Sequence, residues 1–434
     1  MNLTANILAK SSGGQTFFGI LLAIAILLAM ITIHEFGHYV AGKILGFKIN
    51  EFSIGFGPAL FKKRSKKTGE IFALRLIPLG GYCAFDGEDE IEEFVEEKRD
   101  EDGAKNAEEP FEEMQAEGLE EGNLVAETVP EEEYPEPKGE RFNDQAPWKR
   151  IIVLIAGATM NYLLALFLII TMFACFGRPV YQVVKNPPPT ENPTQTAIDT
   201  YNSGLQTGDI ILEINGKNLY LITDYMSVLD GKNKGDVVDV LVIRNGEKQT
   251  VEVTLVEDSN PRNMSDSNSI LFPLGLATRE EVENENGELK MTVTRGGGLA
   301  PANAREGFFP TVGKSFVYSF KIGTTVLRSL GELVTGKLGM EAVGGPATTI
   351  TVTAEQASNG VQEFLSIAAL IGVNLAVFNL LPVPALDGCK IIFCIIEWIR
   401  KKPLNRKVEA IINFAGLIVL FGFAILVDVL HFLH

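Results

Sequence analysis

The residues whose types and spacing could carry chemistry are two histidines and a glutamate in the run His34-Glu35-Phe36-Gly37-His38. On a helix, residues four positions apart lie on one face, so both imidazoles can reach one metal ion. Glu35 points to the side, where its carboxylate can take a proton from a metal-bound water. A catalytic zinc takes three protein ligands and lowers the pKa of its water to about 7. The run is therefore typical of a metal-dependent hydrolase.

A third metal ligand is expected from a second segment, which ends in an acidic residue. Asp387 is the only acid at that end of an apolar stretch, and it follows Pro382 and Pro384. The prolines remove backbone donors and break a helix. The carbonyls that they free, together with the side-chain amides of Asn374 and Asn379, can hold an extended peptide. We therefore expect the two histidines and Asp387 to bind the metal.

The histidine run closes the first of four apolar stretches that are long enough, or nearly so, to cross a bilayer, which takes about 20 residues. Two histidines and a glutamate at the end of a membrane span are costly in lipid and are usually functional. A helix buried in a soluble protein is the alternative for one such stretch, but four in one chain favour a membrane protein. The stretches are Thr16–Ile33, Ile151–Gly177, Phe364–Leu386 and Ala410–Val427.

Lysine and arginine gather beside alternate ends of these stretches, and this orients the chain because cytoplasmic loops are basic. Residues 43–75 hold eight basic residues, and residues 387–409 hold six. Trp148 and Trp398 each stand beside a basic cluster, as interfacial anchors do. We expect four spans, with both chain ends and residues 178–363 outside the cytoplasm.

The formal net charge of the 434-residue chain is −17, which argues against a nucleic-acid partner. Residues 86–144 carry the whole excess, with 25 acidic and 5 basic residues. This acidic insert is poor in aliphatic residues and rich in Glu, Gly and Pro. We expect it to be a largely disordered cytoplasmic tether. A docking tail for a basic cytoplasmic partner is the alternative.

Two β-rich pieces lie outside the predicted spans. Residues 48–77 alternate in polarity in places about a Thr68-Gly69 turn and predict a short β-hairpin beside the first span. Residues 185–275 contain the run Gly204–Gly216, which resembles the signature of a PDZ domain, and a strong hairpin turn at Asn245-Gly246. PDZ domains bind extended chain ends by strand addition. A steric module that blocks bulky substrates without gripping a peptide is the alternative.

A further helix is predicted at residues 311–340. Lys314, Lys321 and Arg328 recur at seven-residue intervals and so share one helix face. We expect an amphipathic helix that lies on the outer membrane surface rather than a fifth span.

With these motifs in place, the sequence resembles the site-2 proteases, which are zinc intramembrane metalloproteases, and specifically the bacterial RseP-like regulators of sigma-factor signalling. The family's H-E-x-x-H matches residues 34–38, and its N-x-x-P-x-P-x-L-D-G matches residues 379–388. Asn374 matches a further family asparagine. Two positions depart from the family pattern: Cys389 stands where a glycine is common, and Ala158 replaces a proline. Neither is a predicted ligand.

The resemblance implies a multi-pass α-helical membrane protein with four transmembrane helices, a membrane-associated β-hairpin and one extracytoplasmic PDZ-like domain. It implies a Zn²⁺ cofactor and a place in the bacterial cell membrane, where the enzyme cuts a transmembrane helix of a single-span protein that another protease has already shortened, such as an anti-sigma factor. Expected partners are that substrate, the lipid bilayer and a peptide or ectodomain at the PDZ-like domain, with no nucleic acid.

The expected site comprises Glu35 as catalytic base, His34, His38 and Asp387 as metal ligands, and Asn374, Asn379, Pro382 and Pro384 as substrate-binding residues. The expected pieces are residues 1–45 (first span), 46–85 (hairpin), 86–144 (acidic insert), 145–178 (second span), 185–275 (PDZ-like domain), 311–340 (surface helix), 361–388 (third span) and 408–430 (fourth span).

Two other functions would use parts of the same pattern. A non-catalytic membrane scaffold could collect envelope proteins through the PDZ-like domain, but it would have no use for the metal motifs. A membrane zinc protease that cuts prenylated chain ends would share H-E-x-x-H, but it would need neither the Asp387 motif nor the PDZ-like domain.

Overall fold

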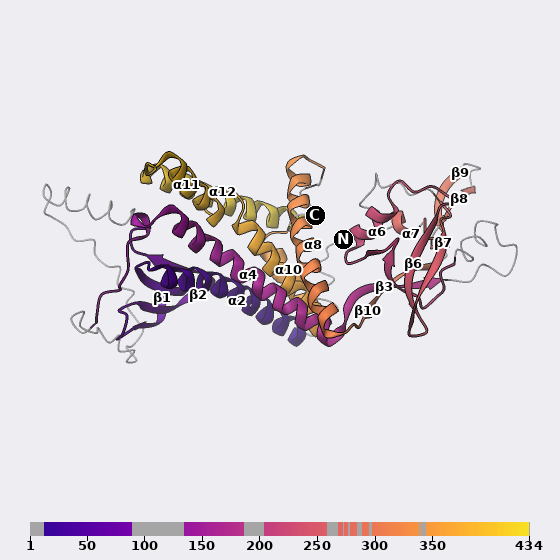
Figure 1. Cartoon of the computed structure of the whole chain (residues 1–434), viewed down its shortest axis with the longest axis horizontal. Helices are drawn as coiled ribbons and strands as arrows, with labels where there is room; N and C mark the ends of the chain where they lie inside the picture. The colour runs from indigo at the N-terminus through magenta and orange to yellow at the C-terminus, as the bar shows by residue number, and fades with distance from the viewer. Residues whose placement is uncertain are drawn as a thin grey trace. The chain divides into compact units, whose positions relative to one another are not determined.

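The computed structural model describes residues 13–88, 134–185, 204–257, 268–271, 273–276, 278–283, 289–294, 297–337, 339 and 344–433. Most of the acidic insert, for which we predict disorder, lies outside these residues. The chain divides into two compact units, one formed by Met1–Leu168 with Gly323–His434 and the other by Ile169–Ile322. Figure 1 shows the elements of both units.

The first unit is built on helices, four of which are long and apolar enough to cross a membrane in the described part of the chain. This confirms the prediction of four candidate spans. Glycines let these helices approach closely: Cβ atoms added at Gly37 and Gly372 would lie 2.9 Å from Cα of Gly157 on α4 and 2.9 Å from Cβ of Ala165. The candidate spans lie in α2 (Gly13–Leu45), α4 (Pro147–Phe176), α10 (Val361–Asn379) and α12 (Arg406–Leu433).

The third span ends earlier than the sequence predicts. Helix α10 stops at Asn379 rather than continuing to residue 386, because Pro382 and Pro384 cannot extend it. Two further helices of this unit, α9 (Pro346–Asn359) and α11 (Asp387–Arg400), were not predicted. The amphipathic helix predicted at residues 311–340 is α8 (Phe308–Val334), and its place on a membrane surface stays a prediction.

The hairpin consists of β1 (Ile49–Arg64) and β2 (Ile71–Phe85), so it reaches further than the expected alternation. Both strands bend, because residues 51–54 pair with residues 81–84 and also with residues 71–74. Gly55 sits at the bend with a φ of +86°, where an added Cβ would lie 2.7 Å from the carbonyl oxygen of Ile77. The long hairpin therefore folds back into a compact sheet beside α2.

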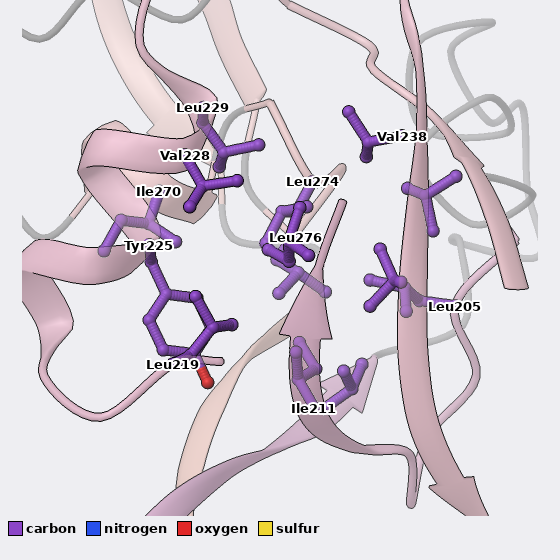
Figure 2. Packing of buried hydrophobic residues seen from close by; sticks show 14 of the residues in the cluster. Leu205, Ile211, Leu219, Tyr225, Val228, Leu229, Val238, Ile270, Leu274 and Leu276 are labelled. Carbon is purple, nitrogen blue, oxygen red and sulfur yellow. The ribbon is translucent and has the colours of Figure 1, made fainter. Parts of the chain in front are cut away.

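The second unit is a β-rich domain around one hydrophobic core. Its main sheet has the order β10-β3-β4-β6-β7, with β5 beside β4. Helix α6 covers a core of aliphatic side chains and Tyr225 (Figure 2). The hairpin predicted at Asn245-Gly246 is confirmed, because β6 and β7 pair across these two residues, whose φ angles are 55° and 87°. The elements are β3 (Arg178–Lys185), β4 (Ile210–Ile214), β5 (Lys217–Asn218), α6 (Ile222–Leu229), β6 (Val237–Arg244), β7 (Glu247–Thr254), α7 (Asn268–Leu271), β8 (Thr278–Glu283), β9 (Leu289–Thr294) and β10 (Gly297–Ala304).

Candidate metal centre

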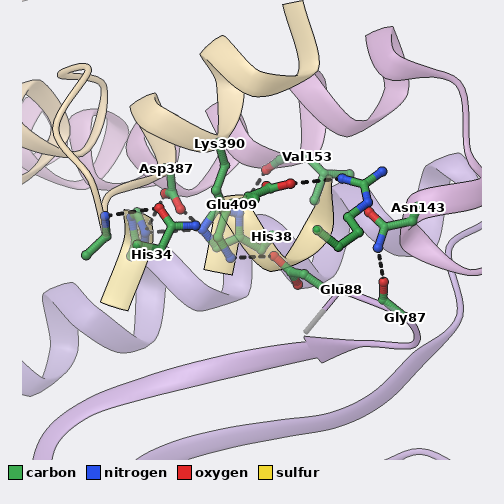
Figure 3. A network of polar contacts seen from close by, with 12 residues as sticks. His34, His38, Gly87, Glu88, Asn143, Val153, Asp387, Lys390 and Glu409 are labelled. Atoms are coloured by element: carbon green, nitrogen blue, oxygen red, sulfur yellow. Dashed lines mark hydrogen bonds and ion pairs between the residues drawn. The ribbon is translucent and has the colours of Figure 1, made fainter. Parts of the chain in front are cut away.

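His34 and His38 lie one helical turn apart on α2, and Asp387, the first residue of α11, faces both of them (Figure 3). The Nε2 atoms of the two imidazoles are 3.1 Å apart. Oδ2 of Asp387 lies 3.1 Å from Nε2 of His34 and 3.3 Å from Nε2 of His38. The structure thus brings together the three residues that the sequence selected as metal ligands, from two helices separated by about 350 positions.

This arrangement fits a tetrahedral zinc site. Bonds of about 2.0–2.1 Å to nitrogen and oxygen place the corners of a tetrahedron about 3.3 Å apart, which is the spacing of the three donor atoms. The carboxylate oxygen that faces the imidazoles is buried and accepts no hydrogen bond from the described residues. Two imidazole nitrogens and one carboxylate oxygen form a ligand set that zinc commonly takes. The fourth corner would remain for water.

Helix α4 orients both imidazoles from behind. Nδ1 of His38 lies 2.8 Å from the carbonyl oxygen of Val153, so Nδ1–H donates to this oxygen and Nε2 is left for a metal. The amide of Asn161 lies 3.4 Å from Nδ1 of His34, and its buried Oδ1 has no partner among the described residues. Turning that amide by 180° would let Oδ1 accept from Nδ1–H, which would give His34 the same orientation.

Gly157 lies midway between these two α4 residues, and the imidazoles fill the space above it. A Cβ added at Gly157 would lie 2.7 Å from Cε1 of each imidazole and closer still to Nε2 of His38. On the facing helix, a Cβ at Gly37 would lie 2.9 Å from Cα of Gly157. Only glycine at both positions allows α2 and α4 to pack this closely at the metal centre.

Glu35 lies beside the hairpin. A Cβ added at Gly81 of β2 would lie 3.3 Å from Cγ of Glu35 and 2.8 Å from the carbonyl oxygen of Ser53. The backbone of β2 therefore passes directly beside the predicted general base. An extended chain that pairs with this sheet would pass close to the predicted reaction centre.

The turn before α11 places Asp387. Ala385 adopts a φ of 75°, and its N–H donates to Oδ1 of Asn413 over 3.3 Å. A Cβ added at Gly388 would lie 2.5 Å from the carbonyl oxygen of Leu380, which explains the glycine that follows Asp387. Asp387 is also the first residue of α11, where its negative charge interacts favourably with the helix dipole.

The far end of α11 is fixed by a buried ion network. Glu397 is almost fully buried and pairs with Arg150 of α4 and Arg406 of α12, and it accepts a hydrogen bond from the N–H of Leu404 over 2.9 Å. A second ion pair, between Lys390 and Glu88, joins α11 to the start of the acidic insert over 2.8 Å. These contacts hold the helix that presents Asp387.

The structure places the other predicted site residues on α10 and in the turn that follows it. Nδ2 of Asn379 lies 3.4 Å from Nδ1 of His34, so the structure brings this residue to the metal centre. Asn374 lies on α10 with a buried Oδ1 that has no partner in the described residues. Pro382 and Pro384 lie in the turn between α10 and α11. The sequence analysis assigned no role at the metal centre to three α4 residues, Val153, Gly157 and Asn161.

The fold and the site together define a class, namely proteins with several candidate membrane spans and a candidate metal centre whose two histidines lie inside one of them. The model of peptidase family M50 matches residues 22–423 of the chain. The chain belongs to this family, the site-2 proteases, and it is a zinc metalloprotease.

Relatives match over most of their length. The regulator of sigma-W protease RasP of Bacillus subtilis (strain 168) is 28% identical over 424 residues, which cover 89% of this chain and 92% of the relative. The zinc metalloprotease RasP of Bacillus licheniformis is 28% identical over 427 residues, with the same coverage. The zinc metalloprotease RasP of Geobacillus kaustophilus is 26% identical over 439 residues, which cover 93% of this chain and 94% of the relative.

Proposed function

We propose that this protein is an endopeptidase that cuts a transmembrane helix of its substrate, with Glu35 as general base and His34, His38 and Asp387 as zinc ligands. One observation carries the proposal. Three donor atoms from α2 and α11 lie within 3.3 Å of one another, two of them inside the candidate membrane span Phe17–Leu45, with Glu35 next to them in the sequence.

Zinc bound at this site would lower the pKa of a water to about 7 and polarise the scissile carbonyl. Glu35 accepts a proton from the attacking water and then donates it to the leaving amide nitrogen. Val153 accepts from Nδ1–H of His38 and so leaves Nε2 of that ring for a metal, and Asn161 with its amide turned would do the same for His34. The turn between α10 and α11 holds Asp387 in place.

A substrate helix has no free backbone groups, so it must unwind before it is cut. The hairpin offers a place for the unwound segment, because residues 81–85 pair on one side only, with residues 49–54, in the described part of the chain. A substrate strand could add to this sheet, and β2 already passes Glu35 at Gly81.

The segment around α10 would hold the other side of the substrate. The buried Oδ1 of Asn374 lacks a partner among the described residues and could accept a substrate N–H. Asn379 lies at the metal centre and can bind backbone near the cleaved bond. Pro382 and Pro384 interrupt the helix and leave carbonyl groups that can accept hydrogen bonds.

The family and a relative's name support the proposed substrate class. A relative that regulates sigma-W supports a role in sigma-factor signalling, with a substrate such as an anti-sigma factor. We place the enzyme in the bacterial cell membrane, with both chain ends and the β-rich unit extracytoplasmic and the acidic insert cytoplasmic. The β-rich unit would act as a PDZ-like domain that binds or excludes the shortened ectodomain of the substrate.

The test uses the full chain in liposomes with single-span substrates that carry either a short or a long ectodomain. Mass spectrometry of the products locates the cut. We expect a chelator-sensitive cut inside the span of the short substrate and no cut with Glu35→Gln, which should retain zinc. Cleavage by Glu35→Gln would contradict the mechanism. Stoichiometric binding of substrate without chelator-sensitive cleavage would favour the scaffold.

A further inference from the structure

Helix α11 exposes an apolar face in the first unit. The side of α11 toward the protein buries Cys394 and Glu397, whereas the outer side carries large apolar residues. The exposure is greatest toward the end of the helix, where Trp398 is 56% and Ile399 77% exposed. Single exposed apolar residues are common, but several on one face of a helix mark an interaction surface. The outer residues are Ile392, Ile395, Trp398 and Ile399.

The position of α11 in the chain shows what this face meets. The helix connects two candidate spans, with only residues 380–386 before it and residues 401–405 after it. Fully extended, these connections reach no further than about 25 Å and 18 Å. Both ends of α11 therefore stay near the ends of membrane spans, at one surface of the bilayer. An apolar face there lies at the boundary between lipid headgroups and acyl chains.

Three cations follow this apolar face. Arg400, Lys401 and Lys402 are all exposed, and none of them forms an ion pair in the described part of the chain. Other basic residues of this region, Lys390 and Arg406, are paired with carboxylates. Lys401 ends α11 with a φ of 54°, so the chain turns sharply within the cationic run. An apolar face ending in unpaired cations is complementary to an anionic lipid surface.

We infer that α11 is a docking surface for anionic phospholipid headgroups, which gather at Arg400, Lys401 and Lys402 while Trp398 and Ile399 enter the interface. Each basic residue near an anionic membrane surface strengthens the attraction roughly fivefold. Because α11 begins at Asp387, the headgroups bind the opposite end of the helix that presents this carboxylate. The inference concerns lipid binding and does not depend on the proposed cleavage.

Trp398 provides a local probe, since Trp148 is the only other tryptophan in the chain. The full-length Trp148→Phe variant is reconstituted into phosphatidylcholine vesicles that contain equal amounts of brominated phosphatidylcholine or brominated phosphatidylglycerol. The bromine quenches a tryptophan that it touches, so the ratio of quenching by the two lipids reports local enrichment of the anionic lipid. We expect brominated phosphatidylglycerol to quench Trp398 at least about twice as strongly.

Charge-matched variants separate the inferred surface from a general effect of net charge. Replacing Arg400, Lys401 and Lys402 together by Gln should bring the quenching ratio close to one. Replacing three exposed hairpin lysines by Gln removes the same charge and should leave the ratio unchanged. A ratio near one in the parent, a ratio that survives the α11 replacement, or a Trp398 that neither lipid quenches would each overturn the inference. The hairpin lysines are Lys62, Lys63 and Lys66.

Discussion

Gly157 gives the sharpest prediction about the metal centre, because a single methyl group there meets both histidines. In Gly157→Ala the new Cβ would start 2.7 Å from Cε1 of each imidazole. Two non-bonded carbon atoms in ordinary contact are about 3.5 Å apart, so the rings or the two helices must move by about 0.8 Å. Neither partner can yield easily, since Gly37 already lies against the backbone of α4.

That displacement is large compared with what a metal site tolerates, which is about 0.2 Å in ligand distance. A misplacement of about 1 Å at a reaction centre costs roughly 100-fold in rate. We therefore expect Gly157→Ala to cleave a model transmembrane substrate about 100-fold more slowly and to lose zinc at chelator concentrations that the parent withstands. Overpacking of this kind also destabilises a protein by about 1–3 kcal/mol.

The assay measures zinc content after titration with a chelator, initial cleavage rate in liposomes and the thermal unfolding midpoint. Gly422→Ala is the matched control, because a Cβ added at that position of α12 has open space around it. The control should keep both zinc and activity. If Gly157→Ala bound zinc as tightly as the parent and cleaved within threefold of its rate, the packing derived for α2 and α4 would be refuted.

Three further predictions concern the ligand, the ion network and the second unit. Asp387→Asn should weaken both zinc retention and cleavage, measured as above, because a neutral amide replaces the carboxylate ligand; unchanged zinc affinity would exclude Asp387 as a ligand. Glu397→Gln should lower stability by about 3 kcal/mol, since it leaves the buried Arg150 without its carboxylate, whereas Glu332→Gln at an exposed pair should cost less than about 1 kcal/mol in the same thermal unfolding series. Burial lowers the pKa of Lys185 from its ordinary value of 10.5 to about 8 in the folded chain. Between these two pH values the unfolded state binds more protons than the folded state, so the stability of the second unit rises with pH. Lys185→Met should abolish that rise and add about 2 kcal/mol at pH 7, measured by hydrogen exchange corrected for intrinsic rates; an unchanged pH dependence would show that Lys185 is not its source.

The sequence predicted the residues of the metal centre because their residue types, their spacing and the apolar stretches beside them can be recognised without knowledge of the tertiary packing. His34 and His38 have a helical spacing, and apolar length revealed the spans that carry them. Asp387 was selected because it is an acid at the end of a predicted span on the same side of the membrane. The structure places all three together. Their roles as ligands, and that of Glu35 as base, remain proposals until zinc is measured.

Other parts of the site leave little trace in a sequence. Val153 acts through its carbonyl group, which every residue possesses, so no pattern could identify it. Gly157 and Asn161 lie one helical turn apart on α4. A polar asparagine inside a span was the one sequence signal that could have indicated that this face of α4 lines the site. The fold of the hairpin was also hidden, since its bend depends on the positive φ at Gly55 and on pairings between distant strand segments.

The central claim is that His34, His38 and Asp387 bind one catalytic zinc ion, and X-ray absorption at the zinc edge of the purified protein tests it most directly. We expect one zinc per chain, with only nitrogen and oxygen ligands at about 2.0–2.2 Å and a spectrum fitted by two imidazoles. His34→Ala should remove one imidazole from that fit or lose the metal. A sulfur ligand at about 2.3 Å, as Cys389 would give, or a spectrum unaltered by His34→Ala, would contradict the claim.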